Sequence, residues 1–328
     1  MVPDAAFTSY YGRPVVKASP WKNDIPAYLF LGGLAAGSSL LAAGADLSGR
    51  NELRRVMRIS ALVGAAAGTV ALIHDLGRPT RFLNMLRVAK PTSPMSVGTW
   101  ILTAFGPMAG IAATAEVAAL LPRQLQTLAR PVTIAARPAG LIAALLAPGL
   151  ASYAGVLLAD TATPAWHAAH RELPFVFAGS AAMAAGGLGM MLASLEEAAP
   201  ARRLAIGGVL LDLAAERRME GSMGISAETL RTGRARPLMR SSRALAAGGI
   251  ATTIAFGRRS RALSFLSGGA LVAASALSRF GIFEAGQQSA RDPRYTVAPQ
   301  RERVDGRGQQ PPGAAKGAAV EVLRPRAQ

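Results

Sequence analysis

The chain has 328 residues, of which 51% are hydrophobic and 17% are charged, and its mean hydropathy is +0.27. It contains no cysteine, which excludes disulfides, thiolate-held iron–sulfur clusters, cysteine-based zinc sites and a cysteine nucleophile within this chain. The net charge of +17 would suit nucleic-acid binding, but the arginines flank apolar segments as membrane topology signals do, so we expect no nucleic-acid partner.

Residues 1–24 are polar and aromatic, and they lack the charged start, apolar run and cleavage site of a signal peptide. We interpret them as a cytoplasmic N-terminal segment. Residues 25–286 form the predicted transmembrane helical domain. Residues 287–328 are rich in Arg, Pro, Gln and Gly, a composition typical of a disordered tail or of a segment that binds a partner.

Long apolar runs follow one another through the middle of the chain. A helix needs roughly 20 mostly apolar residues to cross a bilayer. The predicted fold class is therefore all-α, a polytopic membrane helix bundle of about eight transmembrane helices. The expected spans are 25–45, 56–74, 97–121, 138–159, 173–195, 204–215, 238–256 and 262–282. The sixth is short and is interrupted by Asp212, which favours a tilted or interfacial segment.

An even number of spans places both termini on one side of the membrane. Lys and Arg are more numerous in the segments on that side than in the opposite loops. The positive-inside rule then predicts a multi-pass protein of the cell (plasma) membrane with both termini in the cytoplasm. Three pairs of glycines four residues apart predict close helix packing. The pairs are Gly33/Gly37, Gly64/Gly68 and Gly106/Gly110.

Polar residues stand at the ends of the first two predicted spans. Asn23 and Asp24 open the first helix, and helix capping alone explains both residues. His74 and Asp75 close the second helix, before a glycine and a proline that stop a helix, and Arg78 is a possible ion-pair partner of Asp75. Ionisable residues at the edge of an apolar span are also functional candidates.

The end of the fourth predicted span and the loop after it carry further polar groups. Tyr153 and Asp160 lie in the last turns of that span, and Trp166, His167 and His170 follow in the loop. An aromatic belt and a solvated loop explain Trp166 and the two histidines without any function.

The order of the spans brings these candidates to one membrane face. Six residues from three helices share one depth and side by the parity of the span count: Asn23, Asp24, His74, Asp75, Tyr153 and Asp160. An apolar crevice with a few hydrogen-bonding groups is typical of small-molecule sites. A quinone headgroup suits it, because its carbonyls need donors and its tail needs apolar walls. The arginine-rich opposite loops are expected to offer no comparable set.

Haem and metal ions are the competing ligands. A haem held by two histidines needs both inside facing spans, but only His74 stands at a span end, so we expect no own haem. His167 and His170 have a spacing that suits a metal, but no carboxylate pattern supports it, and no metal site is predicted.

The sequence resembles the NrfD-like family, the membrane subunits of polysulfide reductase and related molybdopterin oxidoreductases. The resemblance covers roughly residues 21–189. It is carried by residues 21–33 (WKNDIPAYLFLGG), 74–79 (HDLGRP), 153–158 (YAGVLL) and 174–180, with Pro164 and Trp166.

This resemblance implies an eight-helix bundle that exchanges electrons between a quinone pool and an iron–sulfur partner subunit, which serves a molybdopterin catalytic subunit. It implies a quinone site at Asn23, Asp24 and Tyr153, with Asp24, His74 and Asp75 as candidates for proton transfer. The quinone, menaquinone or ubiquinone, would be an exchangeable substrate.

Two other functions are compatible with a membrane bundle. A secondary transporter or ion-translocating protein typically shows internal repeats and broken helices at mid-membrane. No clear repeat of halves is present here, and the charged residues noted above lie at the membrane edge. A structural anchor that tethers a soluble enzyme is the third reading.

Overall fold

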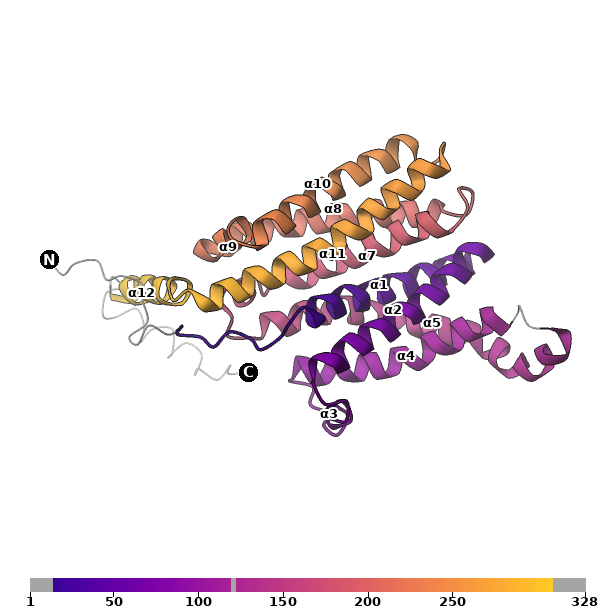
Figure 1. The fold of residues 1–328 in the computed structure, drawn as a ribbon, viewed down its shortest axis with the longest axis horizontal. Helices are drawn as coiled ribbons and strands as arrows, with labels where there is room; N and C mark the ends of the chain where they lie inside the picture. Colours follow the sequence, from indigo (N-terminus) through magenta and orange to yellow (C-terminus); the bar gives the residue numbers. More distant parts are fainter. Residues whose placement is uncertain (1–13, 119–121, 309–328) are drawn as a thin grey trace, which may run out of the picture.

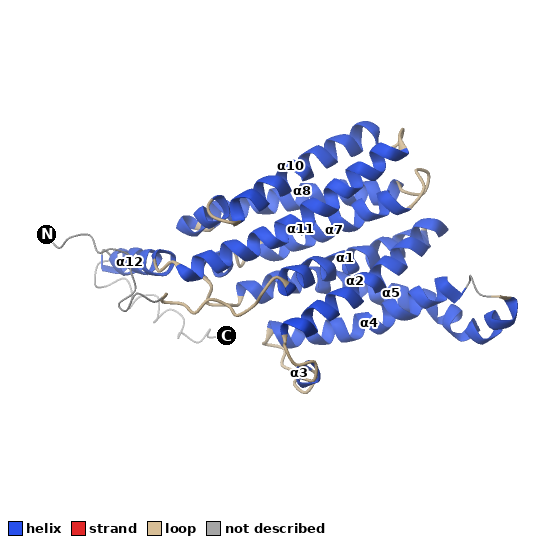
Figure 2. Cartoon of the chain, in the orientation of Figure 1, coloured by secondary structure: helices blue, strands red, loops and turns tan. Residues whose placement is uncertain are grey.

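The computed structural model describes residues 14–118 and 122–308, and within them the secondary structure is helical throughout (Figures 1 and 2). This confirms the all-α prediction. The long helices are α1 (Asp24–Leu47), α2 (Asn51–Asp75), α4 (Pro94–Ala118), α5 (Arg123–Ala159), α7 (Leu173–Leu192), α8 (Ala199–Ser222), α10 (Ala235–Phe256) and α11 (Arg261–Arg291). The shorter elements are α3 (Arg81–Met85), α6 (Pro164–Ala168), the 3-10 turn η1 (Gly224–Ala227), α9 (Glu228–Arg231) and α12 (Arg294–Gly308).

Among the described residues, six of the long helices are apolar enough to cross a membrane: α1, α2, α4, the 129–159 part of α5, α7 and α11. The chain is thus a multi-pass membrane protein. The predicted sixth and seventh spans fall within α8 and α10, which run alongside the other helices but carry more charge (Figure 1). The sixth prediction, residues 204–215, covers only the middle of α8, because the charged residues on either side lowered its apparent hydrophobicity.

The long helices form two groups. The first contains α1, α2, α4 and α5, and the second contains α7, α8, α10 and α11 (Figure 1). α1 and α5 both pack against α7 and so join the groups. Without water to satisfy backbone groups inside a bilayer, each helix must close its own hydrogen bonds, which explains why apolar segments of this length fold as helices.

Two of the three predicted glycine pairs lie at helix contacts. A Cβ at Gly37 would come within 2.6 Å of the Ala181 carbonyl oxygen on α7, and one at Gly64 within 3.1 Å of the Leu31 carbonyl oxygen on α1. These close approaches confirm their packing role. A Cβ at Gly106 or Gly110 would meet no described atom within 4 Å, so the prediction for that pair is wrong.

Two helices extend past their predicted limits. α5 begins at Arg123, before the expected start at residue 138, and its first turns project beyond the other helices (Figure 1). α11 continues to Arg291 and α12 begins at Arg294, so residues 287–291 and 294–308 of the segment predicted to be disordered or partner-binding are helical. Residues 309–328 of that segment, like residues 1–13, lie outside the described residues.

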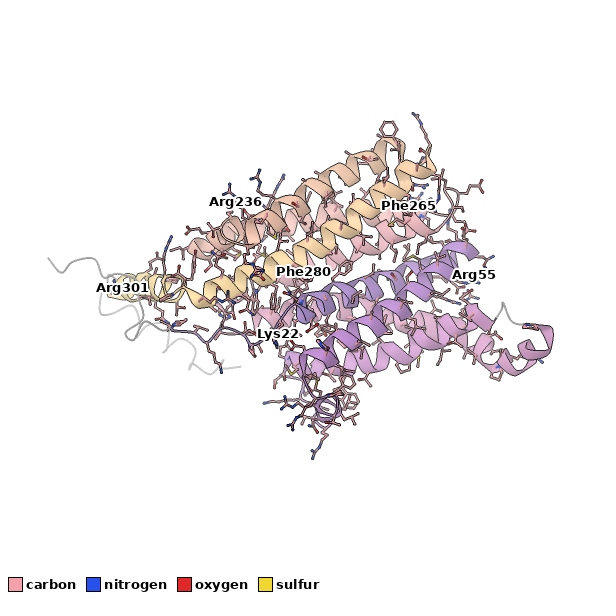
Figure 3. All side chains as sticks on the ribbon, viewed as in Figure 1. Lys22, Arg55, Arg236, Phe265, Phe280 and Arg301 are labelled. Atoms are coloured by element: carbon pink, nitrogen blue, oxygen red, sulfur yellow. The ribbon has the colours of Figure 1, made fainter. Side chains whose placement is uncertain are left out.

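The start of α1 and the end of α11 lie at the same end of the bundle, which we name the terminal end. It also holds the last turns of α2 and α5, with α3, α6, α9 and α12 (Figure 1). Figure 3 shows Lys22 at the terminal end and Arg55 at the opposite end of the α1–α2 pair. The parity argument for one common face therefore agrees with the structure.

Candidate functional site

Asp24 and His74 meet at the terminal end because α1 and α2 run antiparallel. Asp24 is the first residue of α1, and His74 is the penultimate residue of α2. The His74 Nδ1 atom lies 3.0 Å from Asp24 Oδ2, within hydrogen-bond distance. The His74 side chain is 78% exposed and that of Asp24 is 31% exposed, so solvent reaches the pair.

Asp75, the last residue of α2, holds the segment that leads into α1. Its Oδ1 atom accepts a hydrogen bond of 3.3 Å from the backbone N–H of Lys22. The structure thus supplies a different partner from the one considered for Asp75 in the sequence, Arg78. α2 ends here because Gly77 adopts a left-handed conformation, with φ of 70°.

A cavity of about 130 Å³ opens beside Asp75, among α1, α2, α4 and α5. Its walls are mainly apolar, and its polar atoms come from few side chains, including Asp75, Thr99 and Tyr153. The remaining lining residues are Trp21, Ile25, Tyr28, Leu29, Leu72, Leu76, Phe82, Met85, Met95, Leu102, Leu157 and Leu158. A dry pocket with a few oriented polar groups is the usual form of a small-molecule site.

Tyr153 is held in this cavity by its contact with α4. A Cβ at Gly98 would lie 2.0 Å from the Tyr153 Cε2 atom, so the ring occupies the space that a side chain at position 98 would fill. The tyrosine ring packs against the α4 backbone at Gly98, so its position depends on the packing of α4 against α5 and not on a hydrogen bond of its hydroxyl.

The predicted residues divide between two neighbouring spaces. Asp75 and Tyr153 line the cavity, whereas Asn23 and Asp24 line a polar groove of about 460 Å³ on the α11 side, together with Lys22, Phe283, Glu284, Gln287 and Arg291. Trp21 lines both spaces. Asn23 precedes α1 in helical geometry and its side chain makes no capping hydrogen bond, which corrects the expected cap.

The other candidates of the fourth span do not join the cavity. Asp160 is exposed just after α5. His167 Nδ1 lies 3.1 Å from the Ala159 carbonyl oxygen, and His170 Nδ1 lies 3.0 Å from the His167 carbonyl oxygen. These contacts fold the loop back on itself. No group of three or more His, Cys, Asp or Glu side chains that could hold a metal ion occurs in the described part of the chain.

Sequence reasoning missed a cluster of buried charges in the second helix group. Asp212 and Glu216 on α8 are 2% exposed, and Arg279 on α11 is 1% exposed. Arg279 donates from Nη2 to the Phe177 carbonyl oxygen at 2.6 Å, and its guanidinium carbon lies 3.6 Å above the centre of the Phe177 ring. Glu216 pairs with Arg243 of α10 at 2.9 Å.

Several polar atoms of this cluster have no hydrogen-bond partner among the described residues. They are Asp212 Oδ1, and Nε and Nη1 of Arg279. Buried charges without full pairing are costly and are functional candidates inside a membrane. The four-residue spacing of Asp212 and Glu216 was the sequence signal that could have revealed this cluster, because residues four apart on a helix share one face.

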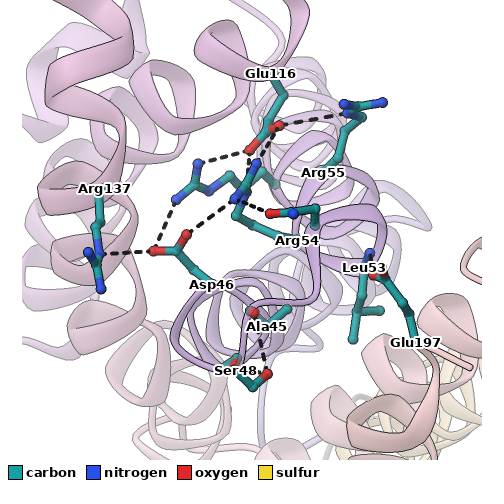
Figure 4. A network of polar contacts seen from close by, with 12 residues as sticks. Ala45, Asp46, Ser48, Leu53, Arg54, Arg55, Glu116, Arg137 and Glu197 are labelled. Atoms are coloured by element: carbon teal, nitrogen blue, oxygen red, sulfur yellow. Dashed lines mark hydrogen bonds and ion pairs between the residues drawn. The ribbon is translucent and has the colours of Figure 1, made fainter. Parts of the chain in front are cut away.

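The opposite end also holds a buried ion network, contrary to the expectation that it offers nothing comparable (Figure 4). Glu116 of α4 accepts hydrogen bonds from Arg54 at 2.8 Å and Arg58 at 2.9 Å, both on α2. Asp46 of α1 pairs with Arg58 at 3.7 Å and with Arg137 of α5 at 3.4 Å. These pairs link all four helices of the first group, a structural role that loop composition did not reveal.

Comparison with known proteins assigns the first helix group and α7 to one family. The sequence matches the family described as Polysulphide reductase, NrfD, over residues 15–204. The matched region contains the cavity, the Asp24–His74 pair and Trp166, and it ends early in α8. No curated protein matches the chain. The family match covers more than half of the sequence, and this multi-pass membrane protein therefore belongs to the NrfD polysulphide reductase family.

Proposed function

We propose that this chain exchanges electrons and protons between a membrane quinone pool and an iron–sulfur partner subunit, which serves a molybdopterin catalytic subunit. Membership of the NrfD family supports the general role of a membrane subunit in an oxidoreductase complex. The quinone assignment is carried by the apolar cavity, where Tyr153 and Asp75 provide polar groups next to the Asp24–His74 pair.

The cavity has a size suited to a ring headgroup. A dry cavity of roughly 150 Å³ holds a benzene molecule in another protein, and the cavity here measures about 130 Å³. A long isoprenoid tail must therefore lie outside it. Met95 lines the cavity and is 46% exposed, which marks a side on which the tail can pass to lipid.

The polar residues provide complementary functions for a quinone. The Tyr153 hydroxyl is a hydrogen-bond donor for a headgroup carbonyl. Reduction to quinol adds one electron and one proton per carbonyl oxygen, and Asp75 is the carboxyl group at the cavity wall that exchanges such protons. The neighbouring His74 and its partner Asp24 continue to solvent. The two electrons come from the iron–sulfur partner subunit during quinone reduction and return to it during quinol oxidation, because the cysteine-free chain offers no thiolates to bind a cluster.

Purification of the chain from its native membrane under mild detergent tests this proposal. We expect copurification of an iron–sulfur subunit and a molybdopterin subunit, and a quinone in the organic extract. The Gly98→Leu variant tests the site itself. Its leucine side chain must occupy the ring position of Tyr153, so less quinone should be extracted from this variant than from the wild type. Recovery of the chain as a stable, isolated protein without quinone would contradict the proposal.

A second candidate function, proton translocation, is favoured by the buried cluster of α8, α10 and α11. Asp212 and Glu216 lie one helical turn apart, and Glu220 follows one turn nearer the terminal end, where Arg243 contacts both glutamates. Carboxyl groups spaced in this way are typical of proton relays in membrane proteins.

Reconstitution of the whole complex in liposomes separates this candidate from simple quinone exchange. The Asp212→Asn variant should retain quinone turnover but lose acidification or alkalinisation of the lumen. Glu196→Gln, which changes an exposed carboxyl in the connection between α7 and α8, is the control. Proton translocation at the wild-type rate by Asp212→Asn would exclude the cluster as the route.

A further inference from the structure

The segment before α1 depends on α11 for its hydrogen bonds. Residues 19–21 precede the first helical turn, so their backbone carbonyls have no intrahelical donors. The Gln287 side chain of α11 donates from Nε2 to the carbonyl oxygens of Ser19 at 3.1 Å and Trp21 at 3.3 Å. Gln287 is buried, and it lies outside the part of the chain that matches the family.

One peptide group is bound on both sides. The carbonyl of Trp21 accepts from Gln287, and the N–H of the same peptide group, that of Lys22, donates to Asp75. Hydrogen bonds in series polarise one another and orient the group between them. Gln287 of α11 and Asp75 of α2 therefore fix the position at which the chain enters α1.

The Trp21 side chain is held by α11 through a second route. Its indole stacks on Trp166 with 6.1 Å between ring centroids. Trp166 in turn packs against Phe283 at 5.6 Å and donates from Nε1 to the Ile282 carbonyl oxygen at 2.9 Å. A Cβ at Gly286 would lie 2.0 Å from the Trp166 ring, so the indole fills the space beside that glycine.

Trp21 occupies the boundary between the two spaces of the candidate site. It lines the apolar cavity of about 130 Å³ that contains Asp75 and Tyr153. It also lines the polar groove of about 460 Å³ that contains Asp24 and Gln287. A displaced Trp21 would merge a mainly apolar cavity with a polar groove, and water would then compete for the cavity's few hydrogen-bonding groups.

We propose, on the basis of the quinone function above, that Gln287 is a positioning residue for the quinone cavity. By binding the Ser19 and Trp21 carbonyls it fixes Trp21 as the wall between the cavity and the groove, and it orients the Lys22 N–H toward Asp75. The last membrane helix thereby completes a site whose lining residues come from the first helix group and the segment before it.

Two measurements on the full chain in membranes test this inference. Because the wild-type chain has no cysteine, Ala18→Cys introduces a single thiol next to Ser19. A membrane-impermeant maleimide reports on the mobility of residues 18–21 through the rate of labelling. In the intact complex, a short-chain benzoquinone analogue gives kcat and KM.

Gln287→Leu keeps the bulk of the side chain but removes both donors. We expect labelling of Ala18→Cys to become several times faster, and KM for the analogue to rise by about tenfold with kcat little changed, because two partly buried hydrogen bonds that support the bound state are lost. Gln287→Glu, which when ionised is similar in size and donates no hydrogen bond, should behave alike.

The matched control is Gln288→Leu. Gln288 is the next residue of α11, but its Nε2 atom donates to Thr232 Oγ1 and not to the N-terminal segment. This variant should label and turn over like the wild type. Unchanged labelling of the Gln287→Leu variant would refute the proposal that Gln287 holds residues 19–21 in place. Faster labelling with unchanged KM would refute the role of Gln287 in shaping the cavity. If the wild-type complex neither bound nor reduced the analogue, the proposed quinone function would be refuted. The role of Gln287 in the cavity, which rests on that function, would be refuted with it.

Discussion

Asp24 and His74 form a hydrogen-bonded pair that contributes little to the stability of the fold. Both side chains contact solvent, and exposed ion pairs contribute at most about 1 kcal/mol to the free energy of unfolding. Proximity to the cavity accounts for the Asp24–His74 pair better than stability does, because the pair is adjacent to Asp75, which lines the cavity. Measurements of turnover and of stability can therefore distinguish a role of this pair in proton exchange from a role in folding.

Asp24→Asn should lower quinone turnover by roughly a hundredfold, because a positioned acid or base contributes about 10²–10⁴-fold to rates of this kind. The thermal unfolding midpoint should stay within error of the wild type. Asp160→Asn, which changes an exposed carboxyl at the same end, is the control. Parallel losses of turnover and stability would point to a structural role for Asp24.

Tyr153→Phe removes one hydroxyl and leaves the ring against Gly98. Because one donor to the headgroup is lost, affinity for a quinone analogue should fall by about tenfold. Tyr295→Phe, on α12 beside a different cavity, should leave the affinity unchanged. Equal affinities of the Tyr153→Phe and wild-type chains would remove this tyrosine from the site.

At the scale of helices, the contact between α4 and α5 sets the shape of the cavity. Gly98→Ala places a Cβ where the Tyr153 ring lies, so it should lower the free energy of unfolding by about 1–3 kcal/mol and weaken analogue binding. Gly106→Ala on the same helix meets no described atom and should be neutral or stabilising by up to about 1 kcal/mol. Thermal unfolding in detergent compares the two; similar values would contradict the packing argument.

The charge cluster between α8 and α11 makes a second prediction about helix packing. Arg279→Met removes the cation facing two buried carboxylates, which should destabilise the protein by about 3–5 kcal/mol. Adding Asp212→Asn should restore part of the loss, because less uncompensated charge then stays buried. Unfolding midpoints of the single and double variants measure this coupling, and equal midpoints would rule it out.

The sequence predicted those parts of the fold that depend on average hydrophobicity. α1 and α7 were found because they are apolar on all sides. α8 was underestimated because Asp212 and Glu216 face inward, and a hydropathy average does not distinguish an inward charge from an outward one. The meeting of Asp75 with Tyr153 followed from counting spans, whereas the separation of Asn23 from the cavity depends on the rotation of α1 about its axis, which no residue spacing revealed.

For the molecule as a whole, the two helix groups differ in their relation to the family. The first group and α7 lie within the matched region, whereas α10 and α11 lie outside it. The two groups are nevertheless interdependent, because α1 and α5 pack on α7, and Gln287 binds the segment before α1. The functional unit is therefore the full bundle.

Orientation in the membrane is a prediction about the whole molecule. If the terminal end is cytoplasmic, a thiol introduced by Ser48→Cys, in the loop between α1 and α2, should react with an impermeant maleimide on intact cells. A thiol introduced by Thr80→Cys, after α2, should react only after lysis. The reverse pattern would invert the proposed topology and place the partner subunits outside the cell.

The contacts between residues 19–21 and α11 also constrain biogenesis. A ribosome releases the N-terminal segment first, whereas its partners Trp166 and Gln287 leave the exit tunnel after most of the chain has been translated. During insertion, the Lys22 N–H can bind Asp75 as soon as α2 is made, but the contacts of Ser19 and Trp21 with Gln287 form only after α11 leaves the translocon. A nascent chain truncated before α11 can pair its first helices, but the wall formed by Trp21 closes only after α11 has been made.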